Sequence, residues 1–393
     1  MKTLTTRAVA AIAFGFAVAS AQGQLTDKTW VGTVAGANNM GTAANWDPSG
    51  APGNNDNGWR LIFGDPTTLA QPSTTGTRGA GGWVLEQAGW TLTAGDGVTL
   101  RINGNLIGTG YVESSGTGIN TINKMVINNG TGANFTTGAG NILSFGSLSG
   151  ANVAQRTLNK FGAGILAVDA GYFRIVNVNA GTLMANGWFR FEGPSAMDVN
   201  NGTTLGGIGT LAMETNGGNV RINDGGTFSP GGDGGLITNP LGTFTMSPVG
   251  AGTANFRLET GSTMRVDLAA GNVSDLFRIV RSDIADTGSV SLFIQSGATL
   301  DLTGYTGTGT YEIVRLEGAG TAFGAGNTFS TVSYNGFPLT PGVDYTLTYN
   351  TKASADTFNG GIQLEVLRVI PEPATFGLLA GGTLLMLARR RRG

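Results

Sequence analysis

A four-residue phrase recurs along the 393-residue chain and constrains its fold more strongly than any other feature. The phrase is a glycine, a small residue, a threonine and an apolar residue. It occurs, once in contracted form, at residues 97–100, 181–183, 202–205, 225–228, 261–264 and 297–300. Glycine turns the chain because it tolerates positive φ, and the threonine–apolar pair then favours a strand. Since one short strand cannot bury its apolar face alone, the phrase predicts strands stacked in successive coils.

The composition indicates an all-β chain of many short strands. Glycine supplies 67 residues and charged residues only 12%, while 40% of the chain is hydrophobic, which is too apolar for simple disorder. We expect a parallel β-helix or solenoid with a terminal β cap, and keep antiparallel β-sandwich domains as the alternative. Cysteine is absent, so stability must come from stacked strands and not from disulfides.

A second pattern fills residues 158–187. It reads L-x-K-x-G-x-G-x-L from Leu158 to Leu166 and continues through a β-prone stretch to Gly-Thr-Leu at 181–183. This pattern resembles the passenger-associated β-strand repeat of autotransporters. The resemblance implies a right-handed parallel β-helix. Autotransporters end in an outer-membrane β-barrel, whereas this chain ends in a short apolar run, so self-translocation is not carried over.

The body divides into three expected regions. Residues 22–95 contain Trp30 and Trp46 in a segment that resembles the leading part of such surface proteins. We expect these indoles to cap the open end of the solenoid; the less favoured interpretation is that they bind a sugar by stacking. Residues 96–305 are expected to form the solenoid itself. Residues 306–368 alternate in polarity, which predicts a C-terminal β region with a terminal hairpin.

The tail at 369–393 consists of three segments in a fixed order. A rigid Pro-Glu-Pro stretch is followed by an apolar run at 374–388 and then by arginines. The residues concerned are Pro371, Glu372, Pro373, Arg389, Arg390, Arg391 and Arg392. The tail resembles the PEP-CTERM sorting signal of Gram-negative bacteria. The resemblance implies processing near Pro-Glu-Pro by an exosortase, a membrane transpeptidase.

The apolar run is expected to form a short transmembrane helix, with the four arginines kept in the cytoplasm. Its 15 residues fall short of the roughly 20 that a typical span needs, so a plain tail anchor or a buried helix stays open. A short and weakly held anchor suits a transient processing signal.

The N-terminus carries a matching export signal. A basic start and an apolar run precede Ala19-Ser20-Ala21, which has the small-x-small pattern of a signal peptidase site. Residues 1–21 are therefore expected to be a signal peptide that directs Sec export, with Gln22 as the mature N-terminus. We expect the precursor to face the periplasm from the inner membrane, and the product to reach the cell surface or extracellular matrix.

Few residues are suited to catalysis. Histidine and cysteine are both absent, which excludes a Ser–His–Asp triad, thiol catalysis and the commonest metal and haem ligands. No cofactor and no metal are expected. Carboxylate chemistry stays open, because β-helices can host polysaccharide-degrading enzymes that use paired acids. The candidate pairs are Asp283 with Asp286, Asp267 with Asp275, and Asp56 with Asp65.

Charge and surface composition favour a structural role. Leader and tail hold six of the 23 cationic residues and one of the 25 acids, so the body has a net charge of about −7, which opposes nucleic-acid binding. We expect a non-enzymatic surface or matrix protein. One side of its solenoid, rich in Asn, Thr, Ser and Gly, would contact exopolysaccharide. The alternatives are a polysaccharide-degrading enzyme and a ligand-specific adhesin; an exposed row of aromatic residues would favour the adhesin.

Overall fold

The structure, a computed structural model, describes most of the body. The described residues are 25–32, 39–53, 56–103, 109–128, 132–150, 157–214, 218–232, 241–249, 253–281, 289–318, 321–323, 328–350 and 360–370. The expected signal peptide, the Pro-Glu-Pro motif and the apolar run with its arginines lie outside these residues.

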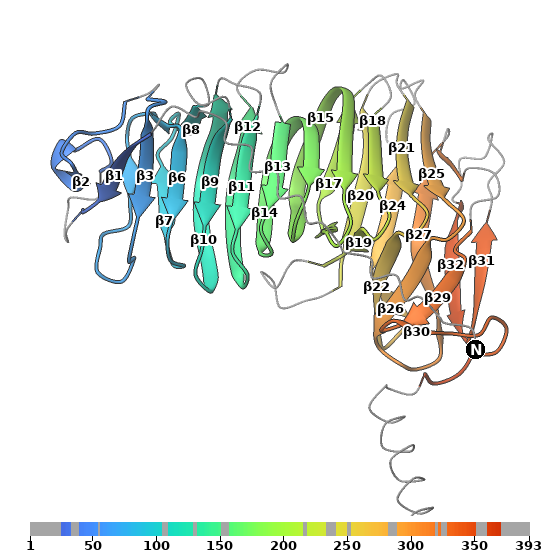
Figure 1. The fold of residues 1–393 in the computed structure, drawn as a ribbon. Helices are drawn as coiled ribbons and strands as arrows, with labels where there is room; N and C mark the ends of the chain where they lie inside the picture. The colour runs from blue at the N-terminus through green and yellow to red at the C-terminus, as the bar shows by residue number, and fades with distance from the viewer. Residues whose placement is uncertain are drawn as a thin grey trace, which may run out of the picture.

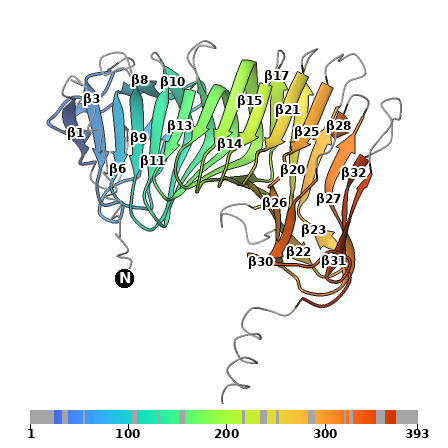
Figure 2. The same ribbon diagram turned by 45° about the vertical axis from the view of Figure 1, so that its right-hand side comes forward.

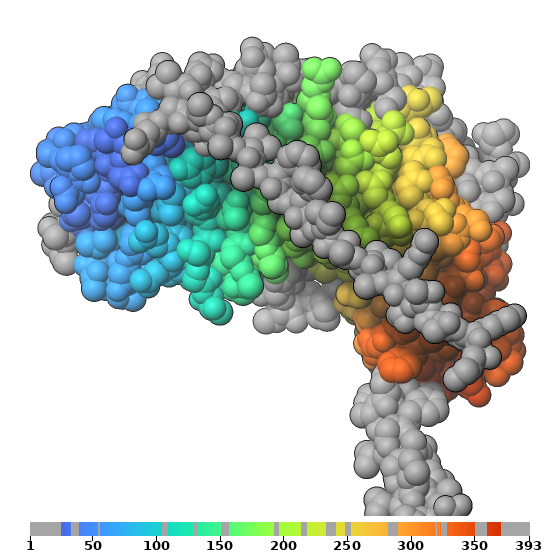
Figure 3. All heavy atoms as spheres, viewed as in Figure 1, coloured from blue at the N-terminus to red at the C-terminus, as the bar shows by residue number. Residues whose placement is uncertain are grey.

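The described chain is all-β, with a long and mostly parallel sheet that is consistent with a β-solenoid. Strand pairing forms three columns, and a typical coil contributes one strand to each. Figures 1 and 2 show the strands in a row that follows chain order from β1 to β32. The colour in Figure 3 changes steadily along the long axis, so successive coils occupy successive positions. Antiparallel β-sandwich domains do not fit this pairing.

The first column holds mainly short strands that pair in parallel with the coil before and the coil after. These strands are β1 (Thr26–Trp30), β3 (Trp59–Phe63), β6 (Gly82–Leu85), β9 (Gly110–Ser114), β11 (Ala133–Thr137), β13 (Thr157–Phe161), β18 (Gly218–Ile222), β21 (Thr253–Leu258), β25 (Ser289–Ile294) and β28 (Thr321–Phe323).

The second column and the third column are built in the same way. The second contains β4 (Ser73–Thr74), β7 (Thr91–Ala94), β16 (Thr204–Gly207), β19 (Thr227–Pro230), β22 (Thr263–Ala269), β26 (Thr299–Gly304) and β29 (Thr331–Tyr334). The third contains β5 (Arg78–Ala80), β8 (Leu100–Asn103), β17 (Thr210–Glu214), β20 (Thr243–Val249), β24 (Leu276–Val280) and β27 (Gly309–Glu317).

Four long strands pass through the corners and serve more than one column. β10 (Gly118–Asn128) and β12 (Asn141–Gly150) contribute to the second and third columns. β14 (Ile165–Val178) and β15 (Thr182–Val199) contribute to all three, with register shifts where the chain turns. The 158–187 pattern therefore supplies the middle of the stack.

Antiparallel strands occur mainly near the two ends of the stack. At the first coil, β2 (Trp46–Asp47) follows a short 3-10 helix, η1 (Ala43–Asn45), and pairs with β1. At the last coils, β30 (Phe337–Pro338) pairs with β29, while β31 (Tyr345–Asn350) and β32 (Gly360–Val366) continue from β27. These strands occupy edges that would otherwise offer unpaired backbone groups to other chains. A further short strand, β23 (Val273–Ser274), folds back on β22.

The recurring glycine phrase stacks in register over five coils. Its threonines lie opposite one another along the second column, in the order Thr182, Thr204, Thr227, Thr263 and Thr299. The corners stack as well, since the N–H of Gly202 donates to the carbonyl of Gly225 at 2.9 Å. Gly225 has φ +70°, which explains why glycine occupies the turn. The copy at 97–100 differs, because Leu100 begins a strand of the third column.

The interior is one continuous apolar core that runs the length of the stack. Strand residues alternate between this core and the outer surface, as β21 and β22 show. At the N-terminal end, Trp30 and Trp46 are 0% and 2% exposed and pack edge-to-face with ring centroids 5.2 Å apart. Their indole N–H groups donate to the carbonyls of Ala70 and Met40. Both rings are therefore inaccessible for stacking on sugar.

Candidate functional site

The described chain stays in contact with the body up to Ile370, the residue before the Pro-Glu-Pro motif. The N–H of Ile370 donates to the Thr306 carbonyl at 2.9 Å, and its side chain is 5% exposed. Arg368 pairs with Asp344. The predicted sorting residues Pro371 to Pro373 and Arg389 to Arg392, and the signal peptidase residues Ala19 and Ala21, lie outside the described residues.

No described helix is long and apolar enough to cross a bilayer. The run predicted to form the transmembrane helix, residues 374–388, is not among the residues that were searched.

Two of the three predicted acid pairs are not brought together by any described contact. Asp283 and Asp286 lie outside the described residues. Asp56 accepts a hydrogen bond from the Gly53 N–H, while Asp65 accepts from the Thr67 N–H at 2.9 Å and hydroxyl at 2.7 Å. Each of these two carboxylates therefore closes its own turn. Within the described ranges, no group of three or more acids is placed to hold a metal ion.

The third pair, Asp267 and Asp275, does come together, at the β22–β23 fold-back. The Asp275 carboxylate is 0% exposed and accepts hydrogen bonds from the N–H of Asp267 at 3.0 Å and of Gly242 at 2.9 Å. Asp267 in turn accepts from the Thr303 hydroxyl. A side chain at Gly231 would collide with the Asp275 carboxylate. Asp275 thus joins three segments of the stack as a structural group.

Burial dominates the electrostatics of Asp275. Its pKa is raised to about 7, chiefly by desolvation; the two backbone N–H groups lower the pKa and the charge of Asp267 raises it. The pKa of Asp267 is also raised by desolvation, against a lowering effect of Arg265. A glycosidase requires two acids that flank a substrate, and a fully buried carboxylate held by backbone donors does not offer that arrangement.

The Asp275→Asn variant tests this burial. The folded state holds the Asp275 proton up to about pH 7, whereas an unfolded aspartate releases it near pH 4, so the folded state binds more protons in between. The free energy of unfolding of the wild type should therefore fall as pH rises from about 4 to 7, by up to about 4 kcal/mol relative to the variant. Urea unfolding of both proteins across that range measures the difference, and parallel pH profiles would contradict it.

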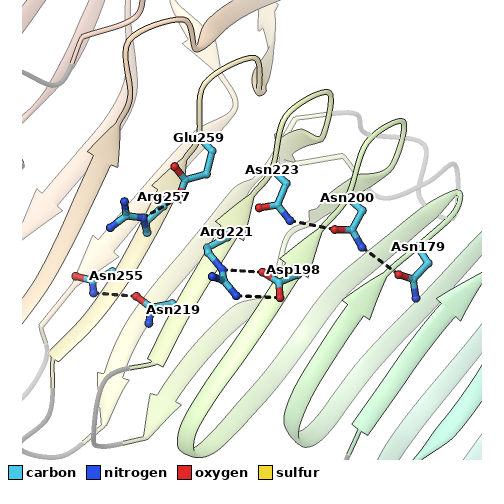
Figure 4. Close-up of polar contacts among 9 residues, drawn as sticks. All are labelled: Asn179, Asp198, Asn200, Asn219, Arg221, Asn223, Asn255, Arg257 and Glu259. Atoms are coloured by element: carbon cyan, nitrogen blue, oxygen red, sulfur yellow. Dashed lines mark hydrogen bonds and ion pairs between the residues drawn. The ribbon is translucent and has the colours of Figure 1, made fainter.

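Polar side chains form ladders along the outside of the stack. In the first column, the Asn159 amide donates to Asn134 at 3.0 Å, and the Asn177 amide donates to Asn159 at 2.8 Å. At the following corner, the amide of Asn200 donates to Asn179 and that of Asn223 donates to Asn200, each at 3.0 Å. Figure 4 shows this corner ladder crossing successive coils.

The ladders continue with charged pairs. Asp198 follows Asn177 in the register, and Arg221 binds it with Nε–Oδ1 and Nη2–Oδ2 distances of 2.7 and 3.1 Å. Nearby, Asn255 donates to Asn219 at 2.9 Å and Arg257 pairs with Glu259 (Figure 4). Each asparagine amide has two donor hydrogens and an acceptor oxygen, so this part of the surface carries many hydrogen-bonding groups. We term the outer surface that carries these asparagines and charged pairs, between Asn134 and Glu259, the polar ladder side.

Lys160 has a role that the sequence pattern did not disclose. It is the lysine of the 158–187 pattern, it is 0% exposed, and its ammonium donates to the carbonyls of Phe161, Gly162 and Ala180 at 2.8, 2.7 and 3.0 Å. Burial lowers its pKa to about 7. The sequence signal was a lysine two residues after the inward-facing Leu158. Two of its acceptors lie in its own turn, but the third, Ala180, is brought close only when two coils stack.

Comparison with known proteins adds no assignment. No protein-family model matches the chain, and no curated protein matches it either.

Proposed function

We propose that the chain is an exported structural protein of the cell surface or extracellular matrix, sorted by its C-terminal tail and associated with exopolysaccharide. The observation that carries the proposal is the order Pro-Glu-Pro, apolar run and four arginines, which begins directly after Ile370, the last described residue in contact with the body. The N-terminal leader supports export by Sec and cleavage after Ala21.

The mechanism follows from topology at the membrane. The four arginines resist translocation, so the apolar run stays in the inner membrane as a transient anchor while the body faces the periplasm. An exosortase-type transpeptidase then acts near Pro371 to Pro373. We propose that the coils are right-handed, as in the autotransporter repeat that residues 158–187 resemble. The polar ladder side offers hydrogen-bonding groups to exopolysaccharide without requiring desolvation of many charges.

The proposal is tested by substituting the sorting residues while leaving the body unchanged. In a Gram-negative host that contains an exosortase, the triple variant Pro371→Ala, Glu372→Ala, Pro373→Ala should accumulate in the inner membrane, and the wild type should reach the surface or medium. Pro338→Ala, in the exposed strand β30, is the matched control and should behave as the wild type. Surface labelling that is equal for the triple variant and the wild type would overturn the sorting role.

A further inference from the structure

Trp188 is an exposed indole in the middle of the stack. It lies on β15 in the third column and is 52% exposed, whereas four of the other five tryptophans are at most 2% exposed. Its register partners on the neighbouring coils are Ala170 and Thr210. Because both partners are small, the adjacent coils place no large side chain at this register, and the indole faces can be approached along the stack.

A second aromatic group adjoins it. Arg190 lies two residues after Trp188 on the same outward side of β15, and its guanidinium sits over the Tyr172 ring, 5.2 Å from the ring centroid. Tyr172 and Arg190 are register partners on consecutive coils, and Ser149 precedes Tyr172 in the same row. Trp188, Tyr172 and Arg190 form a polar–aromatic platform, here called the Trp188 platform.

Cations outnumber acids around the platform. Arg101, Lys124, Arg174 and Arg190 lie along the third column and its corner from β8 to β15. Two acids lie on the same stretch of β14 and β15: Asp169, at the corner that precedes Ala170, whose pKa desolvation raises, and Glu192, two residues after Arg190 on β15. These cations lie far apart in the sequence, and stacking gathers them on one side of a body whose net charge is about −7.

We propose that the Trp188 platform binds an acidic polysaccharide. The indole supplies a flat apolar face for a sugar ring, Arg190 supplies a planar donor for its carboxylate, and the hydroxyls of Ser149 and Thr210 supply hydrogen bonds on either side. Charge complementarity favours an acidic chain over a neutral one. This inference deepens the proposed function, on which it rests, by naming a site and a ligand class.

Single-stranded nucleic acid is the competing polyanion. Its binding sites present several aromatic rings on which successive bases stack, inside a strongly basic groove. The Trp188 platform has one large exposed ring, and the body is net negative, so the geometry suits one sugar ring better than a run of bases.

Binding is measured on the purified full chain in mild detergent, with alginate and galacturonate oligomers as the acidic probes. The wild type should bind both, and Trp188→Ala should weaken binding on the order of tenfold. Trp188→Phe should retain part of the affinity, and Arg190→Gln should lower both the affinity and its salt dependence. Phe337→Ala, which alters a side chain that is 56% exposed on β30, is the control and should bind as the wild type.

The tail arginines also attract polyanions, so the site is judged from the difference between variants. Equal affinity of Trp188→Ala and wild type, absence of binding to both acidic probes, equal binding of neutral dextran, or tighter binding of poly(dT) would each overturn the proposal. Because these measurements use purified protein, their failure is separate from a failure of surface sorting, which is read from cell fractions.

Discussion

Replacing Phe228 by alanine is expected to lower the free energy of unfolding by about 3–5 kcal/mol, the range for deleting a fully buried phenylalanine. Phe228 is 0% exposed and is the apolar member of the recurring phrase. Its ring lies 4.7, 4.8 and 5.2 Å from the ring centroids of Phe256, Phe277 and Phe244. These partners come from the first and third columns, so the deletion leaves a cavity where all three columns meet.

Phe337→Ala provides the comparison for this loss. Phe337 is 56% exposed on β30, so its truncation should change the free energy of unfolding by less than about 0.5 kcal/mol. Urea unfolding followed by circular dichroism, together with limited proteolysis, measures both variants. In a stacked protein the damage also weakens contacts between neighbouring coils, so new cleavage near 225–277 is expected for Phe228→Ala. Equal stability of the two variants would show that the phrase does not build the core.

Lys160→Met is expected to lower the free energy of unfolding by about 3 kcal/mol or more at neutral pH, since buried acceptors that lose a donor cost about 1–3 kcal/mol each. Methionine fills a similar volume, which limits the effect of a cavity. The carbonyls of Phe161, Gly162 and Ala180 would lose the ammonium donor that joins them. Lys124→Met changes a lysine on the outer surface of β10 and should cost less than about 0.5 kcal/mol.

The pH dependence gives a second signature of Lys160. Burial lowers its pKa to about 7, whereas the unfolded chain keeps this proton up to about pH 10. Between these values the unfolded state binds more protons, so the wild type should become more stable as pH rises from about 7 to 10. The Lys160→Met variant should lack that increase. Unfolding curves at several pH values test this, and a gain of the same size in both proteins would contradict the assignment.

Several features of the stack could be predicted because they are local. The glycine phrase predicted turns followed by strands, and its threonines and corners do stack over five coils. The copy at 97–100 also turns at Gly97, with φ +71°, and leads into a strand, but its Leu100 lies opposite Met125 in the third column. A turn followed by a strand specifies the local backbone, but which column the strand joins depends on how the coils before it are wound.

Other features could not be predicted, because they depend on which residues the coils bring opposite each other. The number of residues in a coil varies, so the sequence alone does not give this register. Asp267 and Asp275 are close in the sequence and were identified as a pair, but the burial that makes them structural comes from Gly231, Gly242 and the fold-back at β23. The cations around Trp188 gave no sequence signal, since they are scattered from residue 101 to residue 190. Lys160 likewise finds its third acceptor, Ala180, on the next coil.

Intact-mass and terminal-peptide analysis of protein recovered from the envelope and from the medium tests the central proposal most directly. We predict a mature chain that begins at Gln22 and ends near Pro371 to Pro373, or carries an adduct there, in the surface or medium fraction. Recovery from the inner membrane alone, with Arg389 to Arg392 still attached, would contradict surface sorting and make the chain a tail-anchored periplasmic protein.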